Sequence, residues 1–206
     1  MNMFRSPGRP SLARPSLALL VAAALSSSAP LASAAEPPAK GDKAADFTLG
    51  KLGGGELKLS DALADGPVAL IVLRGFPEYQ CPACSRQVAE YVRHAEEFAA
   101  VGAQVVMVYP GPSGVLPAKA EEFMTDVELP EGFTLLLDPD YKFTNLYHLR
   151  WDAPRETAYP TTLVIGEDGV IDFAKVSKTH GGRTKADDAL HALGHHSHEQ
   201  GHATAE

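Results

Sequence analysis

The sequence predicts an α/β domain in which helices cover both faces of a central mixed sheet. Between residues 68 and 127, apolar branched runs of strand length alternate with segments of helical periodicity, which is typical of parallel strands joined by right-handed crossovers. Further along, apolar runs at 161–165 and 170–176 flank Asp168-Gly169, a dipeptide that favours a hairpin and therefore an antiparallel pair. The 206 residues, 45% of them hydrophobic, suffice for one such domain with extensions.

The elements of the first half follow from periodicity and turn residues. Apolar pairs at 47–49 and 57–59 flank three glycines and predict a short N-terminal hairpin, followed by a helical turn at 60–63 capped by Ser60. The run Val68–Leu73 is a buried strand, and a helical stripe after Cys84 extends to Phe98. A second strand is expected at 104–109 and a helix at 117–127.

The second half predicts a strand at 133–137, a short helix at 141–149 and a polar loop at 151–159. The hairpin strands 161–165 and 170–176 come next, and a closing helix is expected from Thr184 to Leu193. The segment 194–206 is a candidate disordered tail because it holds polar and small residues around four histidines. Transition-metal binding by these histidines, His195, His196, His198 and His202, is the alternative.

The first 34 residues have the pattern of a secretory signal. Three arginines precede the apolar run Leu17–Leu25, and small residues lead to Ala34. A membrane-spanning helix needs about 20 apolar residues, so this run predicts cleavage after Ala34 and a periplasmic or secreted protein without a membrane span. We expect residues 35–40 to be a linker and 41–193 to be the domain.

The charge of the chain is strongly acidic. The net charge is −8, and the signal segment carries three arginines and no acid, so the remainder has −8 − 3 = −11. Such a surface argues against nucleic acid or an anionic membrane as a partner.

The only two cysteines, Cys81 and Cys84, lie between the buried strand at 68–73 and the helix that follows it. Unpaired N–H groups and the dipole at a helix N-terminus favour a thiolate, and Pro82 suits the first helical position. The pattern predicts a reversible redox pair. Two alternatives remain open: a structural disulfide, whose four-residue loop would contribute only about 2 kcal/mol, and half of a zinc site, for which no second cysteine pair exists.

The order of these elements, with Tyr159-Pro160-Thr161 before the last hairpin, resembles the thioredoxin fold over residues 41–193. The N-terminal hairpin, Asp46-Phe47-Thr48-Leu49 and the stretch 135–140 resemble the redoxin branch, which includes the alkyl hydroperoxide reductase and thiol-specific antioxidant proteins, or peroxiredoxins. The resemblance implies a thioredoxin-like three-layer sandwich with an N-terminal β-hairpin extension. It implies thiol chemistry with neither a bound cofactor nor a metal.

The resemblance nominates two different nucleophiles. Pro77 and Cys84 match the peroxiredoxin signature, but Cys81 stands where that family has a threonine or serine. A thioredoxin-type pair instead makes Cys81 the attacking thiol. Peroxiredoxins also carry an arginine before the strand that Pro160 precedes, and we expect no arginine beside the thiolate here unless Arg150 or Arg155 supplies it.

Pro160 is the position of the thioredoxin cis-proline, so the resemblance implies a cis bond there. It also implies that the backbone of Tyr159 and Thr161 and the nearby Pro77 contact an extended substrate.

The expectation is an exported thiol-disulfide oxidoreductase in which Cys81 attacks a protein or small-molecule disulfide and Cys84 resolves the intermediate. In the peroxidase alternative, Cys84 takes oxygen from a hydroperoxide and the sulfenic acid condenses with Cys81. Either reaction needs a dithiol electron donor. A copper chaperone that adds His148 or His180 to the cysteines is a further alternative.

Overall fold

The computed structural model describes residues 36–203, and side chains only as far as Gly194. The segment expected to be a secretory signal lies outside these residues. Within them a seven-stranded mixed sheet has the order β2-β1-β5-β4-β3-β6-β7. The strands are β1 Thr48–Lys51, β2 Glu56–Lys58, β3 Val68–Val72, β4 Gln104–Gly111, β5 Phe133–Pro139, β6 Thr161–Ile165 and β7 Ile171–Val176.

Three central strands, β3, β4 and β5, are parallel, and the two hairpins extend the sheet at its edges with antiparallel pairing. This confirms the predicted α/β class and the N-terminal hairpin. The helices are α1 Leu59–Ala64, α2 Pro82–Arg93, α3 Ala95–Ala100, α4 Leu116–Phe123, α5 Lys142–Leu146 and α6 Ala186–Ala203.

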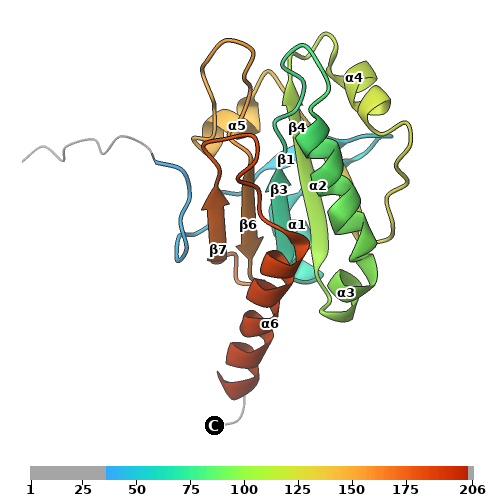
Figure 1. Cartoon of the computed structure of the whole chain (residues 1–206). Helices are drawn as coiled ribbons and strands as arrows, with labels where there is room; N and C mark the ends of the chain where they lie inside the picture. The colour runs from blue at the N-terminus through green and yellow to red at the C-terminus, as the bar shows by residue number, and fades with distance from the viewer. Residues whose placement is uncertain (1–35, 204–206) are drawn as a thin grey trace, which may run out of the picture. The chain divides into compact units, whose positions relative to one another are not determined.

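Alternate residues of β3 supply two separate cores. Val68, Leu70 and Val72 are buried with residues of α1 and α5, while Ala69 and Ile71 are buried with residues of α2, α3, α4 and α6. Successive side chains of a strand point to opposite faces, so a run that is apolar throughout must be covered on both sides. Figure 1 shows α2 and α6 on the face toward the viewer. The three-layer arrangement is confirmed.

α4 and α5 end earlier than predicted, at Phe123 and Leu146. The helices also differ from the prediction in three other places. The stripe from Cys84 to Phe98 is split at His94, which separates α2 from α3 and lets Phe98 stack on Tyr91 with ring centroids 5.5 Å apart. Ser60 is not a cap, because α1 begins at Leu59 and the Ser60 N–H donates to Asp46 Oδ1 at 3.0 Å.

The third difference is at the C-terminus, where α6 continues to Ala203 rather than ending at Leu193. Helical backbone therefore occupies most of the stretch that the sequence predicts to be a disordered tail. The helix can continue there because residues 194–206 contain no proline. The side chains after Gly194 lie outside the described part.

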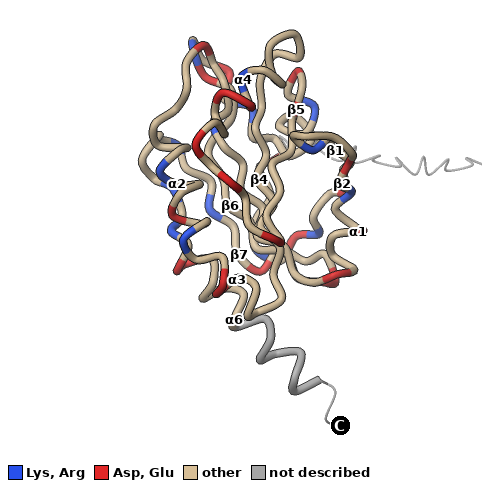
Figure 2. The backbone as a smooth tube through the Cα atoms, turned by 90° about the vertical axis from the view of Figure 1, so that its right-hand side faces the viewer, with Lys and Arg blue, Asp and Glu red and all other residues tan. Residues whose placement is uncertain are grey.

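Charged residues are distributed over many elements. In the view of Figure 2, Asp and Glu positions occur on several helices and loops and do not gather in one patch. No helix of residues 36–203 is long and apolar enough to cross a membrane.

Candidate active site

Cys81 and Cys84 lie at the N-terminus of α2, as the sequence predicts. Cys81 is the N-cap residue with extended backbone angles, Pro82 is the first helical residue, and the Cys84 N–H donates to the Cys81 carbonyl at 2.9 Å. The chain reaches this point from β3 through Gly75, which has φ +72°, and a Cβ atom added to it would lie only 1.9 Å from the Pro110 carbonyl oxygen. Only glycine fits there.

The two thiols are both free but differ in environment. Cys81 is 4% exposed and Cys84 is fully buried. A hydrogen bond from the Cys84 thiol lowers the pKa of Cys81 to about 4; burial opposes this shift, while the N–H groups of Cys84 and Ala83 and the charge of Arg183 support it. Burial raises the pKa of Cys84 well above its ordinary value, and the neighbouring Cys81 adds to this rise. At neutral pH, Cys81 is therefore the thiolate and Cys84 the thiol.

Arg183, in the loop between β7 and α6, is the cation of the site. Its Nη2 atom lies 3.3 Å from the Cys84 sulfur and 3.9 Å from the Cys81 sulfur. Its Nη1 atom donates to Gln87 Oε1 at 2.7 Å and its Nε to the His180 carbonyl at 3.0 Å. The expectation that no arginine lies beside the thiolate is therefore wrong.

Neither arginine that we considered as a substitute reaches the sulfurs. The Arg150 guanidinium lies 4.1 Å from the centre of the Tyr141 ring and donates to the carbonyls of Trp151, Glu156 and Thr157. Arg155 is exposed.

A buried ion pair supports the same end of the sheet. Arg74 is 1% exposed, and its Nε donates to Glu156 Oε2 at 2.5 Å while its Nη2 donates to the Arg155 carbonyl. The other Glu156 oxygen lies 2.9 Å from His180 Nε2. The His180 ring therefore contacts Glu156, while the backbone carbonyl of His180 accepts the hydrogen bond from Arg183.

The copper-chaperone alternative finds little support in this arrangement. His180 turns its ring to Glu156, His148 is exposed, and the group beside the sulfurs is the cation Arg183. In the part of the chain with described side chains, the cysteines belong to no cluster of metal-ligating atoms.

The Tyr159–Pro160 bond is trans, like every other peptide bond of the described residues, so the implied cis-proline is wrong. The trans form of an X-Pro bond is favoured by about 0.5–1 kcal/mol, and the Pro160 carbonyl here accepts the Ser177 N–H at 2.8 Å, at the start of the β6–β7 ladder.

The residues expected to contact an extended substrate have other partners in this structure. The Tyr159 N–H donates to the Leu149 carbonyl at 2.9 Å, and its carbonyl accepts the Thr161 hydroxyl at 2.9 Å. Pro77 is half-buried in the loop before Cys81. Substrate binding by Pro77, Tyr159, Pro160 and Thr161 stays a prediction.

A pocket of about 220 Å³ lies between α2 and the loop that carries Arg183; Arg183 lines it, whereas the two cysteines do not. Three cations and one carboxylate line it, so its charge favours anionic or polar groups. The lining residues are Ala83, Arg86, Gln87, Glu90, His180, Gly181, Arg183, Thr184 and Lys185.

The model of the AhpC/TSA family matches residues 40–174. The chain belongs to the AhpC/TSA family. This AhpC/TSA protein is 27% identical to the peroxidoxin BcpB of Mycobacterium tuberculosis, with a TM-score of 0.60 over 76% of this chain and 97% of that one. It is also 27% identical to a putative thiol:disulfide interchange protein DsbE of Chlorobium tepidum, with a TM-score of 0.56 over 75% of this chain and 97% of that one.

A thiol peroxidase of Chromobacterium violaceum shares the fold at 15% identity, with a TM-score of 0.61 over 80% of this chain and 90% of that one. A comparison with curated proteins gave no match. Fold, family and paired thiols together make this AhpC/TSA protein a thiol-based oxidoreductase of the redoxin type.

Proposed function

We propose that this AhpC/TSA protein is a thiol-disulfide oxidoreductase in which Cys81 attacks and Cys84 resolves. The observation that carries the proposal is the asymmetry of the pair: the pKa of Cys81 is lowered to about 4, while that of the fully buried Cys84 is raised. The thiolate is the nucleophile in disulfide exchange. At neutral pH only Cys81 is a thiolate, so only Cys81 can act as the nucleophile.

The reaction starts when the Cys81 thiolate attacks one sulfur of a substrate disulfide. A Cys81–substrate bond forms, the substrate S–S bond breaks, and the other substrate sulfur leaves as a thiolate. Cys84 then gives up its proton and attacks the Cys81 sulfur. This proton and a second proton from water protonate the two thiolates that leave the substrate. The internal disulfide forms, the second substrate thiol is released, and the substrate has gained two electrons and two protons.

Arg183 supports the second step because it lies closer to Cys84 than to Cys81. Burial opposes the charge that Cys84 must carry when it attacks, and a guanidinium at 3.3 Å stabilises that charge. A dithiol donor, acting through the same steps in reverse, returns the pair to the reduced form.

The pocket beside Arg183 provides space for the substrate group next to the disulfide. Its cations, Arg86, Arg183 and Lys185, favour a protein or small-molecule disulfide with a carboxylate near the reacting sulfur.

Peroxide reduction is the second candidate, and Arg183 is the observation that favours it. A guanidinium beside a thiolate stabilises the charge that develops on the leaving oxygen of a hydroperoxide, and one of the similar structures is a peroxidoxin. Attack by Cys84, as in the peroxiredoxin signature, is opposed by its burial and raised pKa. A peroxidase using Cys81 as the first thiolate fits the geometry better.

We further propose export to the periplasm or outside the cell, on the sequence pattern of residues 1–34. Cell fractionation and sequencing of the N-terminus of the mature protein test this, and a protein that keeps Met1 and stays in the cytoplasmic fraction would contradict it.

Stopped-flow kinetics with the reduced protein separate the two reactions. Trp151 is the single tryptophan and contacts the ring of His180 with centroids 5.4 Å apart, so its fluorescence should report oxidation. We expect a small dicarboxylate disulfide to react far faster than it does with a free thiol at the same pH. A hydrogen peroxide rate several orders of magnitude above that of a free thiol would instead establish the peroxidase.

A further inference from the structure

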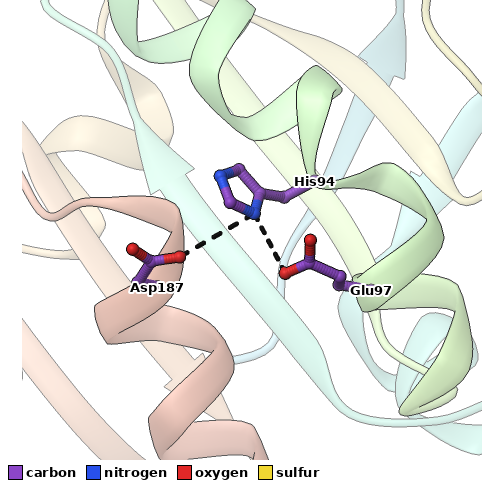
Figure 3. Close-up of side chains that lie close together, drawn as sticks. All are labelled: His94, Glu97 and Asp187. Carbon is purple, nitrogen blue, oxygen red and sulfur yellow. Dashed lines mark hydrogen bonds and ion pairs between the residues drawn. The ribbon is translucent and has the colours of Figure 1, made fainter.

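A cluster of metal-ligating side chains lies at the end of α2 that is remote from the cysteines. His94 occupies the turn between α2 and α3, Glu97 lies in the first turn of α3, and Asp187 lies in the first turn of α6. Figure 3 shows that the two carboxylates approach the same edge of the imidazole from different elements.

The distances bring three potential ligand atoms around one point. His94 Nδ1 lies 3.0 Å from Glu97 Oε2 and 3.8 Å from Asp187 Oδ1, and all three atoms lie within 4.8 Å of one another. Ligand atoms bound tetrahedrally to zinc at about 2.1 Å lie about 3.4 Å apart. The two distances from His94 bracket that value, so small side-chain movements would place all three atoms at bonding distance.

We propose that His94, Glu97 and Asp187 form a binding site for a divalent transition-metal ion, and that Zn²⁺ fits it best. One imidazole nitrogen and two carboxylate oxygens match the donors that zinc accepts in proteins. The side chains of Glu97 and Asp187 are 59% and 76% exposed, which leaves the fourth position open to water.

The charges around the site favour a cation. Glu97 and Asp187 form ion pairs with His94 and with no Lys or Arg among the described ion pairs. Glu90, one helical turn before His94, lies within electrostatic reach of the imidazole and accepts the Ala186 N–H at 3.1 Å. Glu90 thereby fixes the start of α6, and with it Asp187, against α2.

A bound ion would join the α2–α3 turn to the start of α6. Asp187 follows Arg183 by four residues, so the ion would also restrain the loop that carries the cation of the thiol site. His191 follows Asp187 by one further turn. The histidines after Gly194 are not part of the site that we propose.

Isothermal titration with Zn²⁺ tests the site on the full-length chain. The background protein carries Cys81→Ser and Cys84→Ser, so that the thiols do not bind the metal. The tail histidines are also replaced by asparagine in this background, at positions His195, His196, His198 and His202.

Two matched pairs of variants are compared in that background. Asp187→Asn removes a ligand and Asp188→Asn is its neighbouring control; Glu97→Gln removes a ligand and Glu96→Gln is its control. All four side chains are exposed, so none of the substitutions should disturb folding.

We expect the background protein to bind one Zn²⁺ and both ligand variants to bind it at least about tenfold more weakly, with the controls unchanged. Affinity should fall as the pH falls, because a proton competes for His94, whose pKa the hydrogen bond to Glu97 raises. Absence of Zn²⁺ binding by the background protein, or equal binding by Asp187→Asn and Asp188→Asn, would show that the cluster is an ion pair only.

Discussion

Replacement of Arg183 by methionine should raise the pKa of Cys81 by removing the only cation placed against the sulfurs in the described part of the chain. Methionine has a similar length but neither charge nor N–H donors. Arg183 lies at 3.9 Å from the Cys81 sulfur and at 3.3 Å from that of Cys84. The hydrogen bond from Cys84, which is the larger cause of the lowered pKa, stays in place in this variant.

The separation of Arg183 from Cys81 sets the size of the effect. At 3.9 Å, two unit charges attract by about 1 kcal/mol at the dielectric constant of water and by about 4 kcal/mol at an effective value of 20. Since about 1.4 kcal/mol corresponds to one pKa unit, Arg183→Met should raise the pKa of Cys81 from about 4 by about one to three units.

Thiolate absorbance in the ultraviolet, followed as a function of pH in the reduced protein, measures this change. Arg86→Met is the matched control, because Arg86 is exposed on α2 and lines the same pocket. An unchanged titration in Arg183→Met, or an equal change in Arg86→Met, would refute the role assigned to Arg183. Equal melting temperatures of the two variants would exclude a folding defect.

Three further predictions concern stability. The pKa of Cys81 is about 4 in the folded protein and about 8.5 in an unfolded chain. Its thiolate therefore stabilises the reduced protein fully above about pH 8.5, and this stability is lost as the pH falls toward 4. The Tm of the reduced form minus that of the disulfide form should rise from pH 4 to 8, and a difference in Tm that does not change with pH would count against the lowered pKa. Glu156→Gln removes the anionic partner of the buried Arg74 and should lower the free energy of unfolding by about 3 kcal/mol in urea titrations. The exposed Asp152→Asn should change the free energy of unfolding little. Asp138→Ala removes a buried carboxylate that accepts two N–H groups and a hydroxyl at the start of α5, and it should lower the free energy of unfolding by about 2 kcal/mol. A loss below roughly 0.5 kcal/mol, which is the range of an ordinary surface substitution, would show that these hydrogen bonds do not stabilise the fold.

The fold and the position of the cysteines could be predicted from the sequence because their signals are local. Val68–Val72 is apolar at every residue, as expected of a strand covered on both faces. Pro82 directly follows Cys81, and proline is typical of the first helical position, so the start of α2 could be placed to within two residues.

The cation of the site could not be predicted, because Arg183 is close to the cysteines only in space. It lies in a loop between β7 and α6, and no motif distinguishes it from the other arginines. Its place just before the closing helix is the one sequence signal for Arg183, and that signal identifies the cation only when α6 is known to pack beside α2.

The errors at Pro160 and His94 have a different origin. The implied cis bond at Pro160 was transferred from a resemblance, whereas its trans form depends on how β6 begins to pair with β7. The break at His94 has no proline or glycine to signal it, since the residues on both sides, Arg93 and Ala95, favour helices.

Trapping of the mixed disulfide tests the order of attack most directly. Cys84→Ser and Cys81→Ser are each reduced, mixed with the same dicarboxylate disulfide at about pH 6, quenched with acid and examined by intact mass and peptide mapping. At that pH, Cys81 is ionised and an ordinary thiol is not. We predict that Cys84→Ser accumulates a mixed disulfide on Cys81 and that Cys81→Ser stays unmodified over the same time. Faster capture of the disulfide by Cys84 in Cys81→Ser would contradict the proposed mechanism.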